Sequence, residues 1–332
     1  MKIKTVVLSK STTGFYFDDQ KAIKAGAVVD GFYYPGEPVL PGYRSIRMPG
    51  EAVSIQLVLE NGMVAKGDCA AVQYSGTDGR DPLFLADEFI PFINEYLKPE
   101  LLKEDLVSFR EIAGKYDQFT INGNRLHTAI RYGLTQSLLH AIALVKGITM
   151  AEVIRLEYGI IDEEYERIPI FTQSGDERYS NLDKMIIKGV DVFPHALINN
   201  VLKLGSNGEN LLNYLLYLRE RIFKLRTRDN YYPVIHIDVY GTIGIIFDND
   251  LQKMTDYIIT LEKAIAPFKL RVEGPVDSES REDTMLITQA LCRALEKAGS
   301  FVEIVADEWC NTLEDIKYFA DNKAAHMIQI KT

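Results

Sequence analysis

From about Arg167 onward, the sequence alternates between short apolar runs rich in β-branched residues and longer stretches with helical periodicity. Most of the apolar runs end in a polar residue and are followed by an amphipathic stretch. Such alternation is typical of a parallel sheet covered by helices, either a doubly wound open sheet or a (β/α)8 barrel. One helical face is formed by Leu211, Tyr214, Leu215, Leu218 and Ile222, and a second by Leu251, Met254, Ile258, Leu261 and Ile265.

Six strands are predicted in this region. They span residues 168–173, 184–188, 234–238, 270–273, 302–307 and 327–331. A further helix is predicted after Thr312, which forms a capping-box pattern with Asp315. None of the expected turns carries a G-x-G-x-x-G or G-x-x-x-x-G-K-[ST] loop. Because those loops cradle phosphates, their absence favours the barrel over a nucleotide-binding open sheet.

The first 158 residues follow a different order, with strands before helices. Apolar residues alternate over 53–59, and Asn61-Gly62 then supplies a two-residue turn, which predicts a β-hairpin. Apolar residues recur every four positions over 130–142, and Gly147 stands where such a helix would end. We therefore expect an α+β capping domain over 1–158 and a barrel domain over 159–332.

Charge and cysteine content narrow the possible partners and compartment. The 47 acidic residues outnumber the 37 basic ones, giving a formal net charge of −10 without any basic block. Nucleic acid and anionic membrane surfaces are therefore poor partners. Cys69, Cys292 and Cys310 suit neither a disulfide framework nor a C-x-x-C site, which favours a reducing compartment. Since no signal peptide or membrane-spanning run is evident, we expect a cytoplasmic protein with no membrane association.

Three of the predicted strands end in a carboxylate. Asp238, Glu273 and Asp307 are spaced 35 and 34 residues apart, about one strand–helix unit each. A single acidic residue at such a place more often caps a helix or faces solvent. Three in phase would converge at one end of a barrel, and their mutual repulsion would be destabilising without a shared cation. Oxygen ligands favour Mg²⁺, whereas zinc prefers His and Cys at spacings that are not found here.

Four further polar residues are candidates for the same end of the barrel. Lys331 ends the sixth predicted strand, where a nearby divalent cation would lower its pKa and make it a possible general base. His195 follows shortly after the second predicted strand and would approach from the opposite side. Gln173 and Gln329 offer amide groups to a substrate. Taken alone, each of these has a commoner structural explanation, and the remaining histidines are interpreted as structural: His127, His140, His236 and His326.

The whole chain resembles the methylaspartate ammonia-lyases, a family of the enolase superfamily. The resemblance is carried by long segments rather than by spacing alone. They read TGFYFDDQKAIK, GDCAAVQYSGTDGRDPLFLA, NGNRLHTAIRYG, FPHALINNV, HIDVYGTIG, VADEWCNTLED and HMIQIKT.

The resemblance implies an α+β capping domain over an enolase-type modified (β/α)8 TIM barrel. It implies reversible elimination of ammonia from (2S,3S)-3-methylaspartate to give mesaconate, a reaction of glutamate fermentation. It also implies a homodimer that requires Mg²⁺ and is activated by the monovalent cation K⁺. It also implies the site residues: Mg²⁺ ligands Asp238, Glu273 and Asp307, proton acceptor Lys331, His195 on the opposite face, and substrate contacts Gln173 and Gln329. The C3 proton removed in that reaction is only weakly acidic, and its loss gives an enolate-like intermediate, so the reaction suits a lysine base beside a Lewis acid.

The predicted barrel is short of strands. A complete (β/α)8 barrel takes about 250 residues, more than the segment 159–332 provides, and the sequence stops one residue after Lys331. We expect a barrel truncated after its sixth strand, without the seventh and eighth strands of the family or the substrate-binding Thr-Cys pair that they carry. Two alternatives to an active lyase therefore stay open: another proton-abstracting enzyme of the superfamily, such as a cycloisomerase or racemase, and a catalytically silent fragment.

Overall fold

The N-terminal half of the chain is built on an antiparallel sheet, as seen in a computed structural model that describes residues 1–160, 166–175, 177–276 and 278–330. Within these residues the sheet has three strands in the order β1-β2-β3. Its elements are β1 (Ile3–Asp18), α1 (Gln20–Lys24), β2 (Arg47–Leu59), β3 (Val64–Ala70), α2 (Ala86–Phe92), the π-helix η1 (Ile93–Leu97), α3 (Lys98–Leu101), α4 (Phe109–Asp117), the short strands β4 (Thr120–Ile121) and β5 (Asn124–Arg125), α5 (Thr128–Lys146) and α6 (Met150–Tyr158). We call this part the cap.

The predicted hairpin and helix of the cap are both present. The turn between β2 and β3 contains Gly62, whose φ of +87° suits glycine. Helix α5 ends at Gly147, which adopts the left-handed conformation of a C-terminal cap. The predicted apolar face of α5 is buried against β2 and β3. The cap core therefore lies between one face of the antiparallel sheet and α5.

The second half contains a parallel sheet. Within the described residues it has five strands in the order β10-β9-β8-β7-β6, and it does not close on itself. Its elements are α7 (Leu182–Lys188), β6 (Val192–Leu197), α8 (Val201–Leu204), α9 (Glu209–Leu225), β7 (Val234–Asp238), α10 (Thr242–Phe247), α11 (Leu251–Ile265), β8 (Leu270–Glu273), α12 (Arg281–Lys297), β9 (Glu303–Ala306), α13 (Leu313–Asp321) and β10 (Met327–Ile328). The α/β architecture with a separate antiparallel cap is as predicted.

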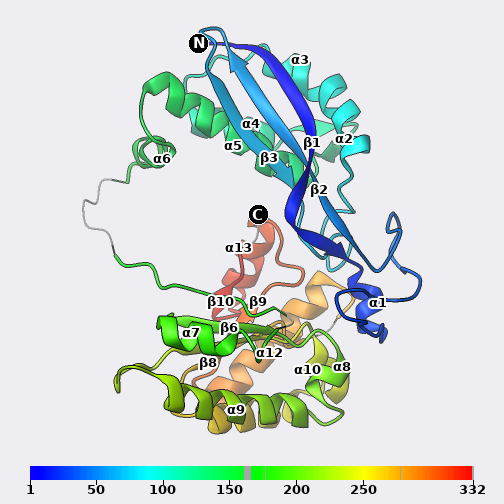
Figure 1. Cartoon of the computed structure of the whole chain (residues 1–332), viewed down its shortest axis with the longest axis vertical. Helices are drawn as coiled ribbons and strands as arrows, with labels where there is room; N and C mark the ends of the chain where they lie inside the picture. The colour runs from blue at the N-terminus through cyan, green and yellow to red at the C-terminus, as the bar shows by residue number, and fades with distance from the viewer. Residues whose placement is uncertain (161–165, 176, 277, 331–332) are drawn as a thin grey trace.

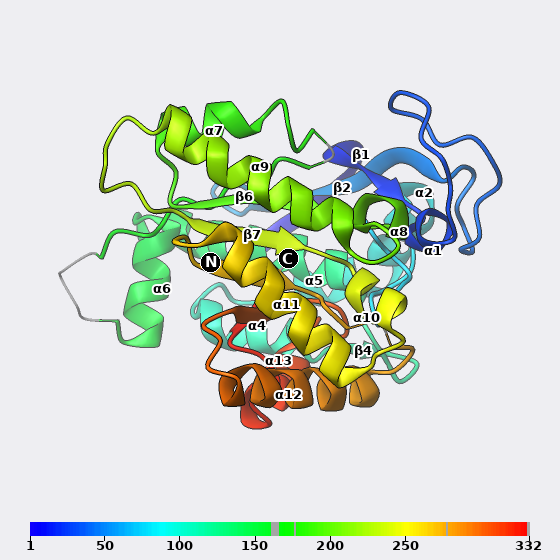
Figure 2. The same cartoon turned by 90° about the horizontal axis from the view of Figure 1, so that it is seen from below.

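Helices α9, α11 and α12 cover one face of the parallel sheet. They lie side by side in Figure 2, and their apolar residues form one core with the strands. Both predicted helical faces are buried there except for Leu251, which is 39% exposed at the start of α11. The cap lies on the opposite side of the parallel sheet from α9 (Figure 1). Loops from the cap and from the sheet come together between these two parts.

The predicted strand at 184–188 is wrong. These residues lie in helix α7, which buries Leu182, Met185 and Ile186 and ends at Gly189 with a φ of +67°. A short apolar run reads as either a strand or a helix turn, and the spacing of buried residues here is helical. The strand of this region is β6, which was not predicted because Pro194 interrupts the apolar run.

The predicted strand at 168–173 is only partly present. It is not a regular strand, yet it runs parallel to β6: Thr172 N donates to Val192 O (3.0 Å), and Ser174 N donates to Pro194 O (2.6 Å). The predicted strand at 302–307 is shortened to β9. Of the strand predicted at 327–331, β10 is present, and Lys331 lies outside the described residues. The sheet thus carries segment 170–175 along its β6 edge.

No single helix in the described part of the chain is both long and apolar enough to cross a membrane. Helices α5 and α6 meet that criterion only as a pair, and the pair is bent by 91°.

Candidate active site

The three predicted carboxylates lie together at the carboxyl edge of the parallel sheet. Asp238 ends β7 and Glu273 ends β8, and the two are partners in the parallel register. Glu273 also pairs with Val305 of β9, so Asp307, two residues later, extends from the same edge. All three side chains are buried, and a carboxylate oxygen from each lies within 4.8 Å of the others. The geometry matches the convergence expected from the sequence.

The chemistry of this cluster fits a magnesium ion. Three buried carboxylates at such distances repel one another and are costly to desolvate unless positive charge compensates them. Their oxygens are hard ligands of the kind that Mg²⁺ prefers, with room in an octahedral shell for water or substrate oxygens. The residues that would hold the ion are therefore Asp238, Glu273 and Asp307.

His195 lies within β6, not after a strand as predicted. A register shift between Pro194 and Ala196, together with a φ of +44° at His195, marks this residue as the extra one in a β-bulge. Bulges re-aim side chains, and here the imidazole reaches the carboxylates. Its Nε2 lies 3.0 Å from Glu273 Oε2 and 3.7 Å from Asp238 Oδ2.

His236, interpreted from the sequence as structural, also belongs to the cluster. It lies two residues before Asp238 on β7, and its Nε2 is 2.6 Å from Glu273 Oε2. Its ring contacts those of His195 and Phe171, with centroids 5.2 and 5.1 Å away. Burial lowers the pKa of His236, although the nearby carboxylate of Glu273 opposes the shift. The i, i+2 spacing from Asp238, which places both side chains on one face of the strand, was the signal available in the sequence.

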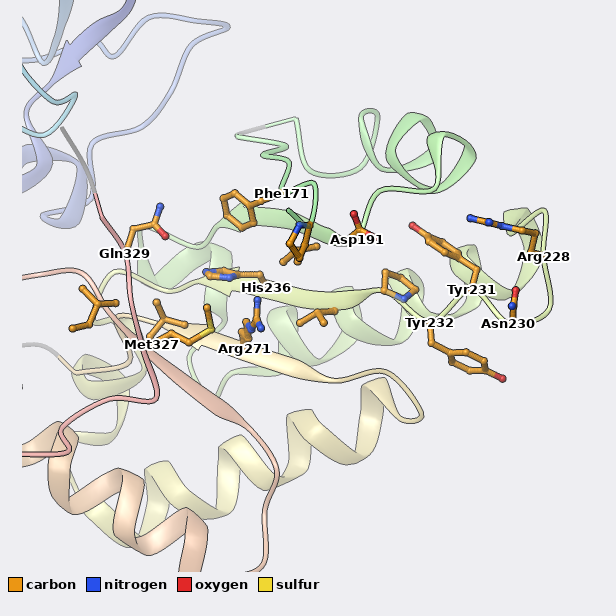
Figure 3. Close-up of a pocket in the computed structure, with 16 residues that line it drawn as sticks. Phe171, Asp191, Arg228, Asn230, Tyr231, Tyr232, His236, Arg271, Met327 and Gln329 are labelled. Carbon is orange, nitrogen blue, oxygen red and sulfur yellow. The ribbon is translucent and has the colours of Figure 1, made fainter. Parts of the chain in front are cut away.

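The structure describes the positions of the two predicted glutamines but not that of the predicted lysine. Gln173 is exposed on the segment that runs along β6. Gln329 follows β10, where its backbone N donates to Ala306 O at 2.8 Å, and its side chain lies at the same end of the cavity as Phe171 and His236 (Figure 3). Lys331 lies outside the described residues, so its predicted place beside the carboxylates stays a prediction.

Two cavities meet near these residues. One, of about 670 Å³, runs along the sheet from Tyr231 and Arg228 to His236 and Gln329 (Figure 3). The other, of about 370 Å³, lies between the cap and the sheet and is lined by Gln329 together with Asp307. A substrate in the second cavity would therefore have a carboxylate of the metal cluster in its wall.

An arginine of the cap reaches the same cluster and was not predicted. The side chain of Arg80 is 6% exposed, and its Nη2 lies 3.1 Å from Asp307 Oδ2. Burial alone would lower the pKa of Arg80, but the charges of Asp307, Glu308 and Asp78 raise it above its ordinary value. Because Arg80 is 227 residues from Asp307 in the sequence, no local pattern could have indicated the contact.

An antiparallel cap over a parallel β/α sheet, with three carboxylates at the ends of consecutive strands, defines a metal-dependent enzyme with the enolase-superfamily fold. The same fold is found at 15% identity in the L-Ala-D/L-Glu epimerase of Bacillus subtilis, with a TM-score of 0.63 over 99% of this chain and 74% of that one. Family models narrow the class further: that of the methylaspartate ammonia-lyase N-terminus matches residues 1–159, and that of the C-terminus matches residues 163–332. The chain belongs to the methylaspartate ammonia-lyase family, whose members are carbon–nitrogen lyases.

Relatives and solved structures agree with that assignment. The methylaspartate ammonia-lyase of Clostridium tetanomorphum is 57% identical over 333 residues, covering 100% of this chain and 80% of that protein. The crystal structure of its magnesium complex matches with a TM-score of 0.87 at 56% identity, over 99% of this chain and 80% of that one. The Citrobacter amalonaticus enzyme containing (2S,3S)-3-methylaspartic acid matches with a TM-score of 0.94 at 54% identity, over 100% and 81% of the two chains.

Proposed function

We propose that this protein eliminates ammonia from (2S,3S)-3-methylaspartate to give mesaconate, reversibly and with Mg²⁺ bound to Asp238, Glu273 and Asp307. The observation that carries the proposal is the convergence of these buried carboxylates at one edge of the sheet. It is supported by a solved relative with bound magnesium and by another that contains the amino acid. Identity of 54–57% to ammonia-lyases, against 15% to the epimerase and to a muconate cycloisomerase, favours this reaction over the alternatives within the superfamily.

The reaction needs a base at C3 and a group that stabilises negative charge. The C3 proton lies next to a carboxylate and is only weakly acidic. Mg²⁺ held by the three carboxylates would act as a Lewis acid toward that substrate carboxylate. Lys331, two residues after Gln329, is the proposed base. Lys331 takes the C3 proton. The electron pair left on C3 then forms the C2=C3 double bond as the C2–N bond breaks, and the ammonium group of the substrate leaves as NH3 with that bonding pair.

The neighbouring side chains would orient the substrate. His195 is buried beside Glu273 and Asp238, where it can donate a hydrogen bond to a substrate carboxylate whose charge grows during proton removal. Gln173 and Gln329 are proposed to hold the polar ends of the substrate through their amides. Fixing the substrate in this way lowers the entropic part of the barrier.

Further properties are proposed from the family resemblance and the composition. The protein would act as a homodimer, with K⁺ as a monovalent activator and a small amino acid as its substrate, in glutamate fermentation. Its location would be the cytoplasm, which is supported by cysteine thiols that are buried rather than paired in the described residues. The net charge of −10 disfavours nucleic acid and anionic membranes as partners.

The test is an absorbance assay for mesaconate with the full chain, Mg²⁺ and 3-methylaspartate. Lys331→Ala is expected to abolish turnover while leaving Mg²⁺ binding, since the base is not a ligand. Asp307→Ala is expected to abolish both, because it removes one of three ligands. Absence of elimination by the folded, magnesium-bound chain would refute the proposed reaction, and retained turnover in Lys331→Ala would refute the role of the lysine.

A further inference from the structure

The loop at residues 77–81 of the cap places the guanidinium of Arg80 against the three carboxylates of the proposed metal site. Arg80 contacts Asp307 Oδ2 through Nη2 at 3.1 Å and Asp78 Oδ2 through Nη1 at 3.4 Å. We propose that Arg80 is a positioning residue: it holds Asp307 in the orientation that binds the divalent ion, and it thereby links metal affinity to the placement of the cap loop. This inference rests on the proposed function only in that the three carboxylates bind a metal.

Burial gives this contact its strength. Arg80 and Asp307 have side-chain exposures of 6% and 3%, so solvent screens their interaction little. A carboxylate has two oxygens, and one can accept from a guanidinium while the other serves as a ligand. An arginine held between two carboxylates restricts the rotation of both, because its planar fork has fixed donor directions.

The loop that carries Arg80 is itself held against the segment that carries Asp307. The backbone oxygen of Asp78 accepts from Trp309 N at 3.1 Å and from Asn311 Nδ2 at 2.9 Å. Gly79, with a φ of +78°, lies so close to Trp309 that a Cβ would be 2.9 Å from the ring. The loop therefore docks within four residues of the metal ligand.

The other end of the loop is anchored in the cap. Asp81 Oδ2 accepts from both Thr128 N and Thr128 Oγ1 at 2.6 Å, at the N-terminus of α5. Arg80 thus extends from a backbone fixed on one side to the cap helix and on the other to the sheet. This double attachment is what allows the guanidinium to define where Asp307 points.

A second ion pair between the cap and the sheet region provides a contrast. Arg125 Nη1 lies 3.5 Å from Glu314 Oε2, and their side chains are 33% and 57% exposed. Exposed pairs of this kind contribute little, about 0–1 kcal/mol. Glu314 is not in the metal cluster, so Arg125 can join the two parts of the chain without affecting metal affinity.

The direction in which metal affinity changes when Arg80 is replaced distinguishes a positioning role from a purely electrostatic one. A guanidinium beside the cluster repels a divalent cation, so if charge alone mattered, removing Arg80 would tighten metal binding. If Arg80 positions Asp307, removing it weakens binding, as loss of the groups that orient metal ligands does by about 10- to 100-fold. The two accounts therefore predict opposite changes.

The experiment is a Mn²⁺ titration of the full chain without substrate, with free Mn²⁺ followed by electron paramagnetic resonance. Arg80→Met is expected to weaken Mn²⁺ binding by about tenfold or more. Arg125→Met, the matched control, is expected to leave the affinity at the wild-type value. An unchanged or tighter affinity in Arg80→Met would overturn the proposal, as would an equal loss in both variants.

A conservative variant covers the case in which Arg80→Met does not fold. Arg80→Lys keeps the charge, but its single ammonium cannot bridge Asp78 and Asp307 as the fork does. It is expected to bind Mn²⁺ more weakly than the wild type and more tightly than Arg80→Met, and wild-type affinity in folded Arg80→Lys would overturn the inference. Failure of the wild type to bind Mn²⁺ at all would count instead against the proposed function.

Discussion

Two imidazoles share one oxygen of a carboxylate at the proposed metal site. Nε2 of His195 and Nε2 of His236 lie 3.0 and 2.6 Å from Glu273 Oε2. Their roles are expected to differ, because His236 is fixed inside strand β7 whereas His195 stands in a bulge of β6. A histidine held in a regular strand suits the orientation of a metal ligand, whereas a bulge re-aims the side chain that it carries, here toward the proposed substrate site.

Substitution of His236 should reveal its support of Glu273. His236→Leu removes the donor to Glu273 and is expected to weaken Mg²⁺ binding by about tenfold, whereas His236→Gln retains an N–H donor and should lose less. Calorimetric titration with Mg²⁺ measures both. Equal affinities in the two variants would show that the hydrogen bond does not orient the ligand.

Site residues could be predicted from the sequence only where their position relative to a strand left a recognisable pattern. Asp238, Glu273 and Asp307 could be foreseen because each follows an apolar strand and their spacing is regular. His236 was hidden because a histidine in a strand is most often part of the core. Arg80 could not be foreseen, since its contact depends on how the cap packs against the sheet and leaves no pattern along the chain.

At the scale of elements, the packing of α5 on β3 leaves no space for additional atoms. A Cβ on Gly133 would lie 2.4 Å from Cys69 N and 2.6 Å from Cys69 Sγ. On the facing strand, a Cβ on Gly67 would lie 2.1 Å from Gly133 O. The helix and strand can approach this closely only because both positions are glycine.

Gly133→Ala is therefore expected to destabilise the cap, by about 1–3 kcal/mol or more, because the added methyl meets backbone atoms. Gly114→Ala in α4 is the matched control: apart from its chain neighbours and the nearby backbone of its own helix, no described heavy atom lies within 4 Å of its Cβ position. Alanine should therefore stabilise the helix by about 0.5–1 kcal/mol. Denaturant unfolding followed by circular dichroism measures both. Equal effects of the two substitutions would contradict the close approach.

The N-terminus of α5 should make stability depend on pH through Asp81. Burial alone would raise the pKa of Asp81, but hydrogen bonds from Thr128 bring it below the ordinary value. Because the folded pKa is the lower one, this stabilisation is fully present above the unfolded value of about 3.9 and is lost as the pH falls through the folded value.

Asp81→Asn is accordingly expected to lower the denaturation midpoint at neutral pH. Its deficit relative to the wild type should shrink as the pH falls below about 4, because the wild-type carboxylate gains a proton first in the unfolded chain and, at lower pH, in the folded one. Urea unfolding at a series of pH values provides the measurement. A deficit that stays constant down to the lowest pH would exclude the charge of Asp81 as its cause.

Element prediction succeeded where periodicity was long and failed where it was short. The 19-residue helix α5 and the hairpin of β2 and β3 were clear, because many positions repeat the same pattern. The apolar pattern of the five residues at 184–188 is too short to distinguish a strand from a helix. In the folded protein, tertiary packing favours the helix. In β6, the proline that hides the strand adjoins the bulge that aims His195 at the cluster.

At the scale of the whole molecule, metal binding and folding should be coupled. The three carboxylates come from distant parts of the chain and converge only in the folded state. A ligand that binds only the folded state stabilises it, by about 2.7 kcal/mol at a hundredfold excess over the dissociation constant. Metal should therefore reinforce the sheet edge at which the carboxylates meet.

Addition of Mg²⁺ to chelator-treated protein is expected to raise the melting temperature, in proportion to the logarithm of the Mg²⁺ concentration once the site is nearly saturated. Differential scanning calorimetry makes the measurement. Asp307→Asn should show little or no rise, because the binding site has lost a charged ligand. A similar rise in the wild type and in this variant would place the stabilising ion elsewhere.

The contact between the two parts of the chain also gives the protein an internal optical probe. Trp309 is the single tryptophan of the sequence, and it touches the cap at Gly79 while its Nε1 donates to Ser278 O at 3.1 Å. Its fluorescence therefore reports on this junction alone, whereas circular dichroism averages over every helix. If the junction opens before the cores unfold, the two signals will change at different denaturant concentrations, and their separation will measure how independently the cap and the sheet unfold.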